Sequence, residues 1–118
     1  MLIGQLAKRT GTSERLLRYY ERVGLLASRR QANGYREYDE AAEPTVRQIR
    51  ALLAAGLSTS IIKLVLPCAD TDGSLSPCPG VLDKLRLQLS RLDERAAELA
   101  RARQTLEQAI TVAESNKS

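Results

Sequence analysis

The chain has 118 residues and a formal net charge of +4, with 18 basic and 14 acidic side chains. Four tyrosines are its only aromatic residues, and it has no histidine. The low aromatic content argues against an aromatic-packed β core, and the lack of histidine excludes histidine-based catalysis. Two cysteines cannot supply a four-ligand zinc site within one chain or the framework of a disulfide-rich secreted domain. With no apolar run of membrane-spanning length and no signal-peptide pattern, we expect a soluble, cytoplasmic protein without a membrane partner.

The positive charge is concentrated in the N-terminal part of the chain. Residues 1–50 contain 10 basic and 6 acidic side chains, a balance of +4, whereas residues 51–118 contain 8 of each. A basic block of globular composition suggests a polyanionic partner, with nucleic acid as the first candidate.

Two short helices are predicted at the start of the chain. The first covers Ile3 to Arg9 and ends before Gly11. Ser13 is a suitable N-cap for a second helix from about Glu14 to Val23, which Gly24 ends. Two short helices joined by a turn that contains glycine are typical of a helix-turn-helix.

The second helix has an apolar face and a basic face. Leu17 and Tyr20 belong to the apolar face. The opposite stripe follows helical spacing and consists of Arg15, Arg18, Tyr19 and Arg22. Such a stripe is more often a solvated surface than a DNA reader. Here its place in a helix-turn-helix, within the basic region, favours nucleic acid because arginine binds guanine edges and phosphates, and tyrosine hydroxyls bind phosphates.

A hairpin and two further helices are predicted next. Asn33-Gly34 lies within Leu25 to Tyr38 and favours a type I′ hairpin turn. Such a hairpin could act as a wing that grips the DNA backbone, with candidate contacts at Arg30, Tyr35, Arg36 and Tyr38. Pro44 suits the first turn of a third helix that ends near Gly56, and Ser58 caps a fourth helix over 59–66.

After a loop over 67–79, the apolar residues follow a period of 3.5 residues, with one polar interruption at Arg103. This period predicts a coiled coil over 80–114, followed by a flexible tail over 115–118. So long a helix cannot bury its seam on a domain this small, and we therefore expect a homodimer. The expected dimerisation residues are Leu82, Leu85, Leu89, Leu92, Leu99, Leu106 and Ile110.

Three sequence segments together resemble the MerR family of bacterial transcription regulators: the run Leu17-Arg18-Tyr19-Tyr20-Glu21, then Gly24-Leu25-Leu26, then 33–38 with the sequence Asn-Gly-Tyr-Arg-Glu-Tyr. The resemblance extends from Ile3 to about Leu66. It implies a winged helix-turn-helix dimer with antiparallel long helices, bound to a pseudo-palindromic promoter element whose overlong spacer it distorts for RNA polymerase. It also implies that the recognition helix contacts DNA through Arg15, Arg18 and Tyr19, that the wing does so through Tyr35, Arg36 and Tyr38, and that Tyr20 packs inside.

Cys68 and Cys78 leave three interpretations open. They can be unreactive loop thiols, a reversible disulfide, or thiolate ligands of a soft monovalent ion such as Cu(I). Metal-sensing members of the family carry their main cysteine pair after the dimerisation helix, where this sequence has none. The sequence also lacks the large C-terminal effector domain of other members, so we expect a short form.

These observations predict an all-α winged helix-turn-helix domain over 1–66 with a small two-stranded wing, followed by the dimerisation helix. The expected function is sequence-specific DNA binding and transcription regulation. The alternatives are a coiled-coil adaptor whose basic head binds protein or RNA, and an effector-independent DNA-binding protein. No arrangement typical of an enzyme is found in the sequence.

Overall fold

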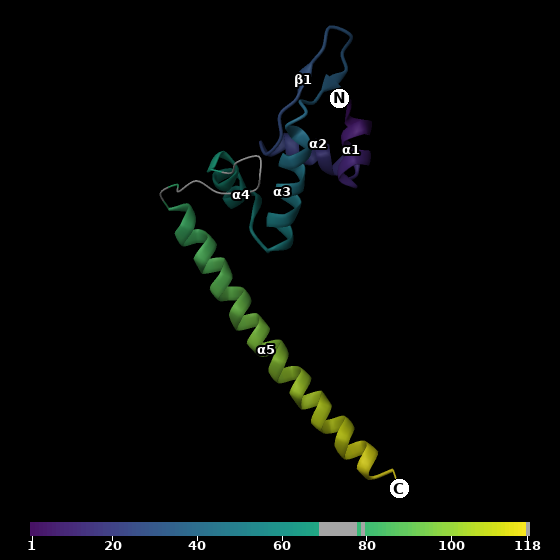
Figure 1. Ribbon diagram of the computed structural model, residues 1–118, viewed down its shortest axis with the longest axis vertical. Coiled ribbons are helices and arrows are strands. Elements are labelled where there is room, and N and C mark those ends of the chain that lie inside the picture. Colours follow the sequence, from purple (N-terminus) through teal and green to yellow (C-terminus); the bar gives the residue numbers. More distant parts are fainter. Residues whose placement is uncertain (69–77, 79, 118) are drawn as a thin grey trace. The chain divides into compact units, whose positions relative to one another are not determined.

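The computed structural model describes residues 1–68, 78 and 80–117. The chain divides into two compact units, Met1–Leu82 and Asp83–Ser118. The described residues are mostly helical, with one two-stranded sheet in the first unit and one long helix that makes up most of the second (Figure 1). The predicted all-α fold with a small wing is therefore confirmed.

The helix-turn-helix consists of α1 (Ile3–Thr10) and α2 (Glu14–Arg22). Helix α1 ends at Gly11, whose φ of 63° lies in the left-handed region that glycine adopts without steric cost. The hydroxyl of Ser13 then accepts a hydrogen bond from the Leu16 amide (3.1 Å) and caps α2 as predicted. The predicted bounds of both helices agree with the structure to within one residue.

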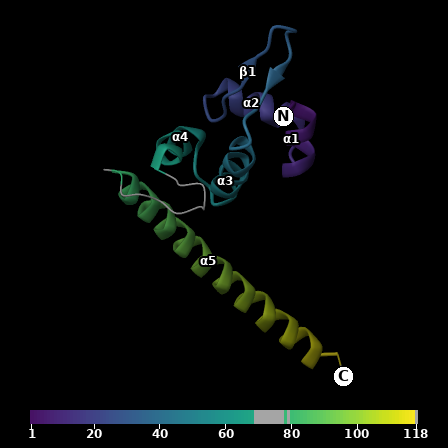
Figure 2. The same cartoon turned by 45° about the horizontal axis from the view of Figure 1, so that its top comes forward.

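Helix α3 (Ala42–Ala54) contacts α1 on one side and α4 (Thr59–Val65) on the other (Figures 1 and 2). Arg50 of α3 donates hydrogen bonds to the carbonyl oxygens of Thr10 (2.9 Å) and Gly11 (3.2 Å). These carbonyls lie at the end of α1, where no backbone donor of the helix remains for them. Arg50 thus fixes the turn that places α2.

The core of the first unit comes from the apolar faces of these helices and from the segment after α2. Helix α4 is capped by the hydroxyl of Ser58, which accepts from the Ile61 amide (3.3 Å), and it continues into a short 3₁₀ helix, Leu66–Cys68. The buried apolar side chains include Leu6, Leu17, Tyr20, Leu25, Leu26, Val46, Ile49, Leu57, Ile62 and Val65.

Helix α5 (Val81–Ser115) is a single helix of 35 residues, about 50 Å long at 1.5 Å per residue (Figure 1). It confirms the long C-terminal helix expected from the heptad pattern. In the single chain, all but one of the expected seam residues are exposed, and Leu85 is half-buried. None of the described helices is long and apolar enough to cross a membrane.

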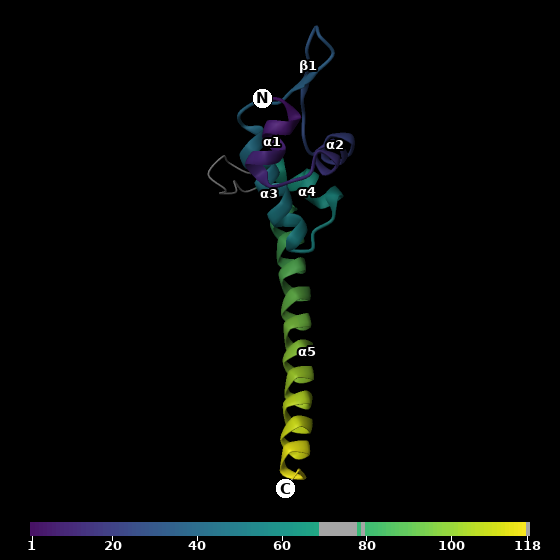
Figure 3. The same ribbon diagram turned by 90° about the vertical axis from the view of Figure 1, so that its right-hand side faces the viewer.

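The wing consists of β1 (Arg29–Arg30) and β2 (Arg36–Glu37), which pair antiparallel and project beyond α1 and α2 (Figure 3). Its turn differs from the predicted type I′. Among the described residues only glycines have a positive φ, so Gly34 (85°) takes that conformation and Asn33 does not. The Gln31 amide donates to the Tyr35 carbonyl (2.8 Å) and the Gly34 amide donates to the Gln31 carbonyl (2.9 Å), which makes a three-residue loop. The Asn33 side chain instead accepts a hydrogen bond from the Tyr35 amide (3.1 Å).

Tyr38 is buried, contrary to the prediction that it contacts DNA from the wing. Only 1% of this side chain is exposed, so it is not available as a contact to DNA. Its hydroxyl donates to Oε1 of Glu21 on α2 (3.1 Å), and its amide donates to the Met1 carbonyl (2.7 Å). Burial and the hydrogen bond to Glu21 raise the pKa of Tyr38 above 10.0, and the charge of Glu21 acts in the same direction, while Arg36 opposes it. Tyr38 therefore anchors the wing to α2.

We expect Tyr38→Phe to lower the free energy of unfolding by about 1 kcal/mol at neutral pH, because it removes the hydrogen bond to Glu21. The folded-state pKa is raised, so this contribution is complete below the unfolded pKa of 10.0 and is lost as the pH rises through the folded value. Urea unfolding of both proteins from about pH 8 to about pH 11.5 should therefore show the difference shrinking in the most alkaline samples. Tyr35→Phe removes the same hydroxyl from an exposed side chain and is the neutral-pH control. A Tyr38→Phe difference that stays constant across the whole range contradicts this assignment.

Candidate nucleic-acid interface

Helix α2 separates its apolar and basic faces. Leu17 and Tyr20 are buried, at 0% and 2% exposure, so Tyr20 packs inside as expected. The opposite face exposes the side chains predicted from the helical spacing, which are Arg15, Arg18, Tyr19 and Arg22. Because the buried leucine and tyrosine fix the rotation of the helix, this basic face is held toward solvent.

Two contacts on the exposed face of α2 are weak. Arg18 lies 3.9 Å from Glu14 one turn earlier, and both side chains are about half exposed. The Arg22 guanidinium lies 5.8 Å from the centre of the Tyr19 ring, a cation–π distance. Exposed pairs of this kind contribute less than about 1 kcal/mol. A stronger anionic partner could therefore replace them at little cost.

The wing adds further cations next to α2. Arg30 is exposed on β1, and Tyr35 is 65% exposed at the end of the turn loop. Arg36 on β2 is different, because its Nη1 lies 2.7 Å from Oε2 of Glu21, a largely buried carboxylate on α2. Glu21 thus occupies one side of the Arg36 guanidinium and leaves its other N–H groups for another acceptor.

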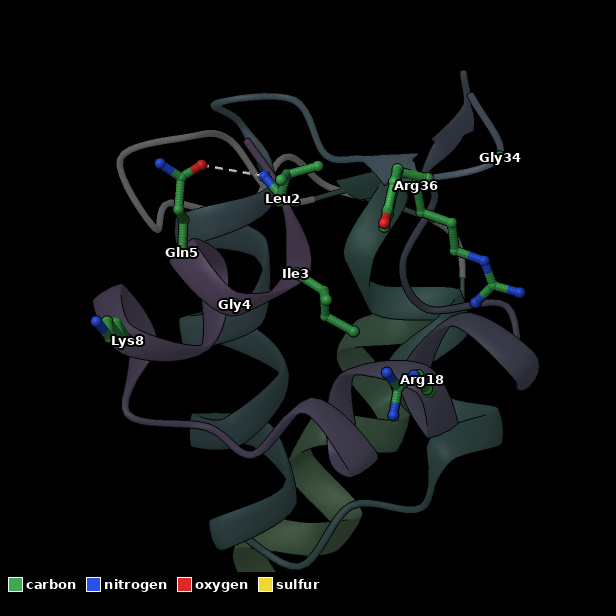
Figure 4. A pocket seen from close by; sticks show the side chains of 9 residues that line it. Leu2, Ile3, Gly4, Gln5, Lys8, Arg18, Gly34 and Arg36 are labelled. Carbon is green, nitrogen blue, oxygen red and sulfur yellow. Dashed lines mark hydrogen bonds between the residues drawn. The ribbon is translucent and has the colours of Figure 1, made fainter. Parts of the chain in front are cut away.

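A cavity of about 660 Å³ lies between the start of α1, helix α2 and the wing (Figure 4). Arg18 and Arg36, which both belong to the predicted site, line it together. Sequence reasoning missed the contribution of α1, namely Gly4 and Lys8. The available signal was their spacing of four residues, which places them on one helix face, but Lys8 belongs to neither the recognition helix nor the wing.

The structure joins Cys68, at the end of the 3₁₀ helix, to Cys78 by a disulfide with a Cα–Cα distance of 6.1 Å. The bond is the one that the second interpretation of the cysteines requires, and its reversibility stays a prediction. Most of the predicted loop over 67–79 lies outside the described residues. Among the described residues, no group of three or more side chains is arranged to hold a metal ion.

Two family comparisons match this chain. Residues 1–67 match the family described as "MerR HTH family regulatory protein", and residues 45–109 match "MerR, DNA binding". The first match covers α1 to α4 and the wing, and the second extends from α3 into α5.

Individual relatives agree with these matches. Nodulation protein NolA of Bradyrhizobium elkanii is 36% identical over 113 residues, which are 95% of this chain and 48% of NolA. The chain thus spans about half the length of that relative. The transcriptional regulator HmrR of Rhizobium leguminosarum bv. viciae is 28% identical over 98% of this chain and 88% of its own length.

Among solved structures, HiNmlR, described as a MerR family regulator lacking the sensor domain and bound to promoter DNA, has the same fold. Its TM-score is 0.66 at 24% identity, over 93% of this chain and 86% of that chain. The family matches, the relatives and the shared fold agree with the geometry of the candidate interface, in which the exposed basic face of α2 lies beside the wing. The chain belongs to the MerR family of DNA-binding regulatory proteins.

Proposed function

We propose that the chain acts in the cytoplasm as a homodimer that recognises a pseudo-palindromic promoter element. The observation that carries this proposal is the exposed basic face of α2 beside the wing. In this proposal α2 enters the major groove, where Arg15 and Arg18 can pair with guanine edges or phosphates. Tyr19 and Arg22 flank these contacts.

The wing contacts the DNA backbone beside the groove that α2 occupies. Arg30 and Tyr35 supply exposed donors, and Arg36 supplies the N–H groups that Glu21 leaves unoccupied. Phosphate contacts of this kind set the register of a protein on the duplex without reading sequence. We therefore assign specificity to α2 and positioning to the wing.

The seam of α5 supports the homodimer. Leu89, Leu92 and Leu99 are 58%, 41% and 59% exposed in the single chain, and Leu106 and Ile110 are exposed to a similar extent. Complete burial of a leucine contributes about 1.5–3 kcal/mol relative to exposure, so pairing with a second copy would be strongly favourable. A two-fold dimer presents two copies of α2, which matches a promoter element with two related half-sites.

Pairing of two α5 helices in antiparallel orientation fits the MerR family, and so does the proposed action on transcription. In this action the dimer distorts an overlong promoter spacer so that RNA polymerase can use it. The structure of HiNmlR with promoter DNA supports the DNA-bound arrangement. An adaptor that binds RNA or protein through the same basic face is the rival, and it would show no preference for two-fold symmetric duplex.

The disulfide suggests an input signal. Cys68 follows the helices of the DNA-binding domain and Cys78 precedes α5 closely, so the bond joins the segments on both sides of the loop. We also propose that the thiol–disulfide state of Cys68 and Cys78 changes promoter activity. Once reduced, the same two sulfur atoms would also suit a soft monovalent ion.

Arg18→Ala should weaken binding to a duplex selected by the wild-type protein by about 1–3 kcal/mol, because it removes a base or phosphate contact. Fluorescence anisotropy at fixed salt measures the change. Arg91→Ala, which removes an exposed arginine from α5 outside the seam, is the control and should bind like wild type. If Arg18→Ala binds as tightly as Arg91→Ala and the wild type, Arg18 is not part of the interface.

Leu92→Asp should abolish the dimer, and DNA binding with it, because the substitution places a charge in the apolar seam. Leu87→Asp makes the same change at a leucine of α5 that is 53% exposed but lies outside the seam, and it should leave the dimer intact. Sedimentation equilibrium and a binding titration give both readouts. A Leu92→Asp dimer that still binds DNA would refute the proposed seam.

Cys68→Ser and Cys78→Ser should each remove the difference in promoter activity between oxidised and reduced protein. Transcription in vitro, with native mass spectrometry of the same samples, reports activity, bound metal and thiol state together. If wild-type activity is equal in both states, the disulfide is structural. A metal mass on the reduced protein that both substitutions remove would identify a metal response in its place.

A further inference from the structure

The cavity between α1, α2 and the wing combines two kinds of lining. Its apolar part comes from Leu2, Ile3 and Tyr35, and its charged part from the side chains of Lys8, Arg18 and Arg36. In Figure 4, Lys8 extends from α1 on one side, while Arg18 and Arg36 lie on the other side of Ile3. Cations from three separate elements therefore lie on two sides of one apolar surface.

Gly4 of α1 also lines this cavity, and its identity is not explained by the fold. Its φ is not positive, so its backbone conformation suits any residue. Apart from its chain neighbours and the backbone of α1, a Cβ at this position would meet no described atom within 4 Å, so packing does not require glycine either. Glycine in a helix is less stable than alanine, and it is used where a ligand must approach the backbone closely. The absent side chain keeps this part of the cavity open.

Lys8 is the cation of the cavity whose charge is least compensated. Arg36 shares its guanidinium with Glu21, and Arg18 lies near Glu14. Lys8 is exposed, and within the described part of the chain it has no ion-pair partner. Because Lys8 follows Gly4 by four residues, its side chain lies on the same face of α1 as the open position.

We propose that this cavity holds one sugar–phosphate unit of the bound duplex, with Lys8 as an additional phosphate contact. The deoxyribose packs on the apolar lining, and the two phosphates that flank this sugar take the charge of Lys8 on one side and those of Arg18 and Arg36 on the other. The inference rests on the proposed DNA binding and extends the interface to α1, which neither the recognition helix nor the wing includes. A phosphate contact from α1 adds affinity for any sequence, since the sugar–phosphate backbone carries no base information.

The first test uses the full chain, a duplex selected by the wild-type protein from a random-sequence pool, and an unrelated duplex of equal length. Lys8→Gln should weaken binding to both, and it should reduce the slope of log affinity against log salt by about one for each protomer bound. Lys84→Gln removes an exposed lysine from α5 and is the matched control, for which the slope should not change. An unchanged slope for Lys8→Gln overturns the assignment of Lys8.

The second test fills the cavity without changing charge. Gly4→Leu should weaken binding to both duplexes by about tenfold or more, since the side chain occupies the space of the sugar–phosphate unit. Thermal melting should show a fold at least as stable as wild type, because leucine is a far better helix former than glycine. Wild-type affinity of a folded Gly4→Leu protein overturns the inference; if this variant does not fold, the salt slope of Lys8→Gln decides.

Failure of the proposed DNA binding and failure of the cavity inference give different experimental results. If the wild-type protein selects no duplex, the proposed DNA binding fails and the cavity inference fails with it. If the wild-type protein binds and Arg18→Ala weakens binding, but Lys8→Gln and Gly4→Leu behave as wild type, the cavity inference alone is wrong.

Discussion

The carboxylate of Glu21 connects α2 and the wing, the two parts of the proposed DNA-binding surface. It lies on α2, is largely buried, accepts a hydrogen bond from the Tyr38 hydroxyl and forms an ion pair with the Arg36 guanidinium of the wing. A hairpin with only two residues in each strand is not stable by itself, so the wing depends on such contacts. The bridge between Leu2 and Glu37 adds a third attachment, to the segment before α1. Together these contacts set the orientation of the wing relative to the recognition helix, and they also form the cavity that both line.

The local features of the DNA-binding domain could be predicted because they depend on neighbouring residues. Ser13 and Ser58 cap their helices within three positions of the amides that they bind, and the apolar spacing of α2 determines that Leu17 and Tyr20 are buried. The role of Tyr38 depends on Glu21, which lies 17 positions earlier, and no local pattern contains that distance. A signal did exist. Arg36 and Tyr38 are two residues apart in an extended segment, so their side chains lie on the same face of it. Glu21 on α2 contacts both side chains.

The second unit presents the opposite case, because its sequence indicates an interaction that a single chain cannot show. The period of 3.5 residues in α5 specifies a seam, and in the single chain the leucines of that seam are mostly exposed. Their burial requires a partner, and a second copy is the partner that also supplies a second recognition helix. In the proposed dimer, function is divided between the units: the first binds DNA, and the second sets the number of copies that bind.

We propose that α2 and its attached wing form one reading surface that the dimer duplicates with two-fold symmetry. Hydroxyl-radical footprinting of the wild-type protein on both strands of a selected duplex tests it most directly. We expect two protected half-sites related by two-fold symmetry, each with protection of the backbone beside the major groove that α2 occupies. A single protected segment, or protection without two-fold symmetry, would contradict it.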